Sequence, residues 1–150
     1  MSREEICTAE MPAVEMIAHI GLDVLNLLGE RFGQEMGRQF ERIWEQCISE
    51  TQGFDWEIFH EIRPDRDNLD MNITIIKSRY RQIGGAKDEK MLLEGFLEVI
   101  HRVSTSAKSY LGEGPVNDAL QQAGEMLSMI GKYQRDPVIT EAFVSRLRGA

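Results

Sequence analysis

The sequence has few cysteines, no long apolar run and a charged N-terminal stretch. Its two cysteines, Cys7 and Cys47, are too few for a disulfide framework or a zinc site. A membrane-spanning helix needs about 20 consecutive apolar residues, and the longest apolar runs here contain only a few. Because the opening sequence MSREEIC is charged and lacks an apolar signal core, we expect a cytoplasmic protein without a membrane span.

Basic residues are also scarce, with 17 against 25 acidic residues in a chain of 150 and a net charge of −8. Such a charge repels phosphate backbones and anionic lipids, so we expect neither nucleic acid nor a membrane as a partner. The chain lacks the Gly-x-Ser-x-Gly and Gly-x-x-x-x-Gly-Lys motifs, and we expect no cofactor. The length predicts a single domain over residues 1–150, with residues 1–11 as a flexible arm.

The apolar residues between Pro12 and Glu50 recur at the spacing of an α-helix and predict a long N-terminal helix. They lie three, four or seven positions apart: Ile17, Val24, Leu28, Phe32, Met36, Phe40, Ile43 and Cys47. Gly29, Gly33 and Gly37 form a second stripe, and each glycine destabilises a helix interior by about 0.5–1 kcal/mol. The stripe indicates either the close approach of another backbone or a kink near Gly33.

Residues 54–83 change from helical spacing to alternation. The residues of one face occupy every second position on both sides of a turn-forming sequence: Trp56, Ile58, His60 and Ile62 before it, and Leu69, Met71, Ile73 and Ile75 after it. β-Branched residues dominate 73–76, which favours a strand. We therefore predict a central β-hairpin in which Ile58 faces Ile73. Two helices, over 55–62 and 67–83, are the alternative.

Three helices are predicted after Gly84 and Gly85. The first follows the capping residue Asp88, the second follows the Gly-Glu-Gly-Pro loop at 112–115, and the third begins near Val138. The prediction is an α+β fold, predominantly helical, with a long N-terminal helix, one central β-hairpin and three C-terminal helices. An all-α bundle is the alternative.

Two Glu-x-x-His sequences, Glu57/His60 and Glu98/His101, have the spacing of di-iron ligands in four-helix proteins. However, Glu98 and His101 fall on the side of their helix opposite the apolar residues. Glu57 and His60 point to opposite faces if the segment 54–63 is a strand. We therefore predict no metal site.

Three basic residues, Lys77, Arg79 and Arg81, continue the apolar face of the second predicted strand. In so acidic a chain, this position indicates a site for a small anion such as a carboxylate, although pairing with surface acids is the alternative. The predicted ligand-binding residues line this face and its end: Trp56, His60, Arg79, Tyr80 and Arg81. They predict a non-catalytic ligand-binding or regulatory protein with an apolar pocket and a basic mouth.

The order of a strand, an Arg-Pro-Asp turn, a second strand, Ser78-Arg79-Tyr80 and then Ile83-Gly84 resembles the central part of the bacterial amino-thiazoline-carboxylate hydrolase-like family. The resemblance covers about residues 54–84, and Ser78 stands where that family is expected to have a cysteine. It implies a hydrolase of a small carboxylate-bearing substrate. Ser78 and His60 are then the candidate catalytic residues, with Arg79 beside them.

A third hypothesis is a protein–protein interaction module. The stripe of Gly29, Gly33 and Gly37 lets two helices approach closely, and three residues widen the apolar surface beyond the main stripe: Leu22, Leu25 and Leu27. We therefore predict a symmetric homodimer through this face. Packing of a C-terminal helix against the glycines within one chain is the alternative.

Overall fold

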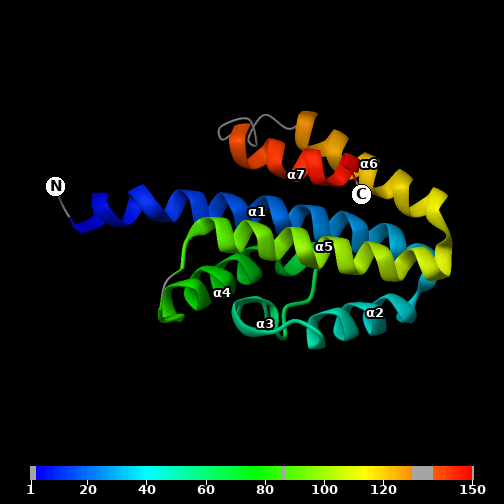
Figure 1. Cartoon of the computed structure of the whole chain (residues 1–150), viewed down its shortest axis with the longest axis horizontal. Coiled ribbons are helices and arrows are strands. Elements are labelled where there is room, and N and C mark those ends of the chain that lie inside the picture. The colour runs from blue at the N-terminus through cyan, green and yellow to red at the C-terminus, as the bar shows by residue number, and fades with distance from the viewer. Residues whose placement is uncertain (1–2, 86, 130–136, 150) are drawn as a thin grey trace.

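The protein is built from α-helices (Figure 1). The computed structural model describes residues 3–85, 87–129 and 137–149. Within these ranges the chain forms seven α-helices and one 3-10 helix, and no strand. In chain order they are α1 (Arg3–Met36), α2 (Arg38–Ser49), α3 (Gly53–Phe59), η1 (Arg66–Asn68), α4 (Leu69–Gln82), α5 (Glu89–Leu111), α6 (Glu113–Met129) and α7 (Pro137–Gly149).

Helices α1 and α5 form the centre of the bundle. They run side by side in the same direction, with α6 and α7 on one side of the pair and α2, α3 and α4 on the other (Figure 1). A Cβ atom at Gly21 would overlap the ring of Phe96, so only glycine allows α1 and α5 to approach this closely. This packing places the second half of α1 beside α2.

The predicted β-hairpin is wrong, and the fold is an all-α bundle rather than α+β. Ile58 and Ile73 are both buried, but they lie in α3 and α4 instead of facing each other across two strands. Met71, which the hairpin would turn inward, is 56% exposed. The buried residues of α4 follow helical spacing: Asn72, Ile73, Ile76 and Tyr80. Strand propensity is a weak preference, and burial of this helical stripe outweighs it.

The turn-forming residues of the predicted hairpin begin a helix. Asp65 Oδ1 accepts a hydrogen bond of 3.0 Å from the backbone N–H of Asp67, and Asp65 Oδ2 accepts one of 3.2 Å from Asn68 Nδ2. These bonds cap η1, which leads directly into α4. The observed helices are therefore close to the alternative of two helices over 55–62 and 67–83.

The long N-terminal helix is interrupted at Gly37 rather than near Gly33. Helix α1 ends at Met36 and α2 begins at Arg38. Gly37 between them has a φ angle of 58°, a left-handed conformation that favours glycine. At its other end α1 begins at Arg3, before the predicted start at Pro12. Residues 1 and 2 of the predicted arm lie outside the described ranges.

Helices α5, α6 and α7 correspond to the three predicted C-terminal helices, but α6 begins at Glu113, within the loop predicted at 112–115. The carboxylate of Asp88 caps α5, as expected, by accepting a hydrogen bond of 3.0 Å from the backbone N–H of Met91. Across the part of the chain that the structure describes, no helix has the length and apolar character needed to cross a membrane.

Candidate functional site

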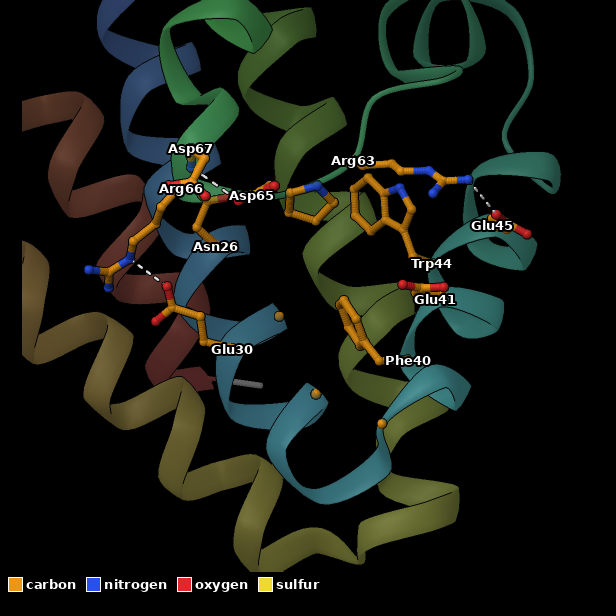
Figure 2. A pocket seen from close by; sticks show the side chains of 14 residues that line it. Asn26, Glu30, Phe40, Glu41, Trp44, Glu45, Arg63, Asp65, Arg66 and Asp67 are labelled. Atoms are coloured by element: carbon orange, nitrogen blue, oxygen red, sulfur yellow. Dashed lines mark hydrogen bonds and ion pairs between the residues drawn. The ribbon is translucent and has the colours of Figure 1, made fainter.

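A cavity of about 610 Å³ lies between the second half of α1, the first part of α2 and residues 63–67 (Figure 2). We call residues 63–67 the strap. Helix α1 contributes Asn26, Gly29, Glu30 and Gly33, and α2 contributes Phe40, Glu41, Trp44 and Glu45. Small-molecule sites in proteins typically measure about 300–1,000 Å³, so the cavity has the size of such a site.

The predicted glycine stripe forms one wall of the cavity. A Cβ atom at Gly29 would lie 3.3 Å from Phe40 Cε1, so a side chain there would press on the aromatic ring. A Cβ atom at Gly33 would meet nothing within 4 Å, because this position faces open space. Gly37 is required by its backbone conformation. The surroundings thus differ at each of the three glycines, and together these residues leave a cavity wall without side chains.

Two buried aromatic residues of α2 form the opposite wall. Trp44 is held in place because its indole N–H donates a hydrogen bond of 2.6 Å to the carbonyl oxygen of Ile62. Phe40 packs against Phe32 of α1 with the ring centroids 6.2 Å apart. Because both rings are fixed by the surrounding fold, the apolar surface of the cavity is formed in advance of any ligand.

Asn26 is the unusual residue of the cavity. It is only 3% exposed, and neither its Nδ2 nor its Oδ1 atom has a hydrogen-bond partner among the described residues. A buried polar group without a partner destabilises the folded state by about 1–3 kcal/mol. Figure 2 shows the side chain directed toward Asp65, so the strap closes over the amide.

Two ion pairs connect the strap to the helices on either side. Arg66 Nε lies 2.6 Å from Glu30 Oε1 of α1, and Arg63 Nη2 lies 3.0 Å from Glu45 Oε1 of α2. In Figure 2 the two guanidinium groups point away from each other. All four side chains are about half exposed or more, and exposed pairs of this kind each contribute only about 0–1 kcal/mol. The strap is therefore held by weak, exchangeable contacts.

The sequence-predicted ligand residues lie on α3, α4 and the turn between them, and none lines the cavity. Trp56 stacks on His60 with the ring centroids 4.3 Å apart, and His60 Nδ1 donates to the Trp56 carbonyl at 2.8 Å. Arg79 Nη1 donates to the carbonyls of Ile58 at 2.9 Å and His60 at 2.5 Å. Burial lowers the pKa of Arg79, against the opposing effect of Glu61. In this position Arg79 holds the C-terminal end of α3.

The other predicted site residues of α4 are Ser78, which precedes Arg79, and Tyr80 and Arg81, which follow it. Tyr80 is buried, and the ammonium of Lys87 lies 4.9 Å from its ring centroid and donates to its backbone carbonyl. Arg81 is exposed. Ser78 Oγ accepts a hydrogen bond of 3.3 Å from Gln82 Nε2, one turn along the helix. A catalytic role for Ser78 and an anion site at Arg81 stay predictions.

Cys47 and Asp55 are the other titratable side chains with a perturbed environment. Burial raises the pKa of the Cys47 thiol, whose Sγ atom lies 3.7 Å from Ser106 Oγ. Such a thiol is a packing group rather than a nucleophile.

In the described ranges, no group of three or more histidine, cysteine or acidic side chains is arranged to hold a metal ion. Glu98 instead accepts a hydrogen bond of 3.0 Å from Arg102.

Sequence reasoning identified the glycine wall but missed the cavity it borders. The signal for Asn26 was present: it is the one polar residue inside an otherwise apolar stretch from Val24 to Leu28. The strap was visible only as a turn, because its carboxylates and guanidinium groups are ordinary for a surface loop. The chain matches no protein-family model, curated protein or solved structure, so the cavity is interpreted from its own residues. The resemblance of 54–84 to a hydrolase family accordingly stays a prediction.

Proposed function

We propose that this protein is a cytoplasmic, non-catalytic protein that binds a small molecule in the cavity between α1, α2 and the strap. The unpartnered amide of Asn26 is the observation that supports this most directly. A leucine, whose side chain has the same branching and number of heavy atoms, would avoid the free-energy penalty of the unpartnered amide. An asparagine at this position is explained if a ligand supplies the missing hydrogen bonds.

A ligand reaches the amide when the strap moves outward. The carbonyl of Arg63 accepts a hydrogen bond of 2.9 Å from Asn72 Nδ2, which anchors the start of the strap to α4. The rest of the strap is attached to α1 and α2 by the exposed pairs of Arg66 and Arg63. Because these exposed pairs are weak, we expect them to exchange and the strap to act as the entrance to the amide of Asn26.

Gly33 provides a matched pair of variants that tests this proposal. Gly33→Leu places a side chain in the open space of the cavity, whereas Gly33→Ala adds only a Cβ atom that meets nothing within 4 Å. A small-molecule library is screened against the wild type by ligand-observed NMR and thermal shift. We expect the compounds that bind the wild type to bind Gly33→Ala but not Gly33→Leu, with unchanged circular dichroism in both variants. Hits that bind Gly33→Leu as well as the wild type contradict the proposal.

A homodimer through Gly29, Gly33 and Gly37 is a second proposal for the same face. The open space at Gly33 supports it, because a second helix would find no side chain in its way. Against it, Leu22 and Leu25 are already buried within the chain, and Leu27 is partly buried against the same core, so a second copy would cover little of them. Light scattering at tens of micromolar measures the mass directly; a monomeric wild type removes this proposal and leaves the cavity free for a ligand.

A further inference from the structure

We infer that the ligand of this cavity is a small organic cation, such as an alkylamine. This inference rests on the proposed function and adds the chemical class of the ligand. Five carboxylate side chains and two guanidinium groups line the cavity, which gives the lining a formal charge of −3. A concave site lined by one sign of charge concentrates ions of the opposite sign.

The distribution of these charges strengthens the inference. Both arginines are engaged by Glu30 and Glu45 at the rim, and they point away from each other. They are therefore not directed at a shared anion inside the cavity. Among the described residues, Glu41 and Asp67 are lining carboxylates without an ion pair, and Glu41 is the one of these two that lies on α2 with the aromatic wall.

Glu41 also lies beside the aromatic wall. It follows Phe40 in the sequence and precedes Trp44 by three positions, so Glu41 and Trp44 share one side of α2. Figure 2 shows Glu41 between the side chains of Phe40 and Trp44. A carboxylate next to aromatic faces favours an organic cation, because the ring faces attract positive charge and the carboxylate accepts its hydrogen bonds.

The buried amide of Asn26 is compatible with this chemistry. Its Oδ1 atom accepts hydrogen bonds from an ammonium group, and its Nδ2 atom donates to a hydroxyl or carbonyl of the same molecule. Because both atoms are without partners, the amide selects a ligand that carries polar groups at more than one point. An apolar hydrocarbon would leave the amide without hydrogen bonds and would gain no binding free energy from it.

Three probes with one carbon skeleton test the class of ligand: butane-1,4-diamine, butane-1,4-diol and succinate. Each is titrated into the full-length protein and followed by isothermal calorimetry and NMR. We expect saturable binding of the diamine, with an affinity at least about tenfold higher than that of the diol and no binding of succinate. Glu41→Gln should weaken diamine binding by about tenfold and leave diol binding unchanged.

Glu89→Gln is the matched control, because Glu89 is also exposed in the first helical turn but lies on α5, away from the cavity. It should leave diamine binding as in the wild type. Preferred binding of the diol or succinate that Gly33→Leu abolishes overturns the cation inference and retains the proposed function. Diamine binding that survives both Glu41→Gln and Gly33→Leu is non-specific attraction to an acidic surface and overturns the inference. Failure of the wild type to bind the diamine at millimolar concentration overturns it as well.

Discussion

The carboxylate of Asp55 lies against Gly95, where a Cβ atom would come within 2.7 Å of Asp55 Oδ1. The missing side chain at Gly95 lets α3 pack onto α5, and it leaves the carboxylate half-buried. Burial raises the pKa of Asp55; Glu98 raises it further, while Arg102 opposes the shift. The ionised form of this residue is therefore disfavoured in the folded protein.

Asp55→Asn should change how stability depends on pH. Because the folded-state pKa of Asp55 is raised, the folded protein binds the proton more tightly than the unfolded chain. The contribution of Asp55 to stability is fully present when the pH is below 3.8, the ordinary pKa of this group. It is lost as the pH rises through the raised pKa of the folded state. Relative to wild type, Asp55→Asn should thus gain unfolding free energy over this window. The gain should stay below about 1 kcal/mol, because solvent screens a half-exposed carboxylate.

Urea unfolding at a series of pH values from 3 upward measures this difference, with Glu57→Gln as the control. Glu57 lies on the same helix but is exposed. Its variant should run parallel to the wild type across the series. A difference between Asp55→Asn and wild type that shrinks as the pH rises would falsify the assigned direction of the pKa shift.

Asn26→Leu should stabilise the ligand-free protein by about 1–3 kcal/mol, because it removes a buried amide that has no partner. Asn72 offers a matched control, since it is equally buried but donates a hydrogen bond of 2.9 Å to the carbonyl of Arg63. Asn72→Leu should destabilise the protein by about 1–2 kcal/mol. Urea unfolding of both variants measures the two effects. Equal destabilisation by the two substitutions would show that the Asn26 amide is already satisfied.

Helical spacing was sufficient to predict the helices after Gly85. In α5, for example, Leu92, Phe96, Val99 and Val103 repeat three or four apart and are all buried, and Asp88 marks where the helix begins. The signal is strong there because a long helix repeats its buried face several times. No comparable repetition is available in the central segment, where α3 is one short helix of seven residues.

The central segment could not be assigned from spacing because a short alternation fits two structures. Ile58 in α3 and Ile62 beyond its end are both buried, whereas Trp56, two positions before Ile58 on the same predicted strand face, is 44% exposed. The alternation therefore reflected composition rather than a common buried face. The cavity could not be predicted from the sequence for a related reason. The surrounding fold decides whether a glycine such as Gly29 or Gly33 faces an aromatic ring or open space.

Gly33→Ala and Gly37→Ala should have opposite effects on stability. Gly33 lies inside α1 and has room for a Cβ atom, so alanine should stabilise the protein by about 0.5–1 kcal/mol. Gly37 has room as well, but its φ angle of 58° disfavours any side chain, and alanine should destabilise by about 1–2 kcal/mol. Thermal unfolding of the two variants checks the position of the helix break. Destabilisation at Gly33 with tolerance at Gly37 would place the break at Gly33, where the sequence suggested it.

Arg79→Ala should destabilise the protein by about 1–3 kcal/mol. In the sequence alone, Arg79 cannot be distinguished from the neighbouring basic residues Lys77 and Arg81. Its Nη1 atom donates to two carbonyls at the end of α3, those of Ile58 and His60, and alanine leaves both without this donor. Arg81→Ala removes the same charge two residues later, from an exposed position, and should change stability by no more than about 0.5 kcal/mol. Urea unfolding compares the two, and a succinate titration of each variant tests the predicted anion site. If Arg79→Ala is as stable as Arg81→Ala and also loses succinate binding, Arg79 is a ligand-binding residue rather than the anchor of α3.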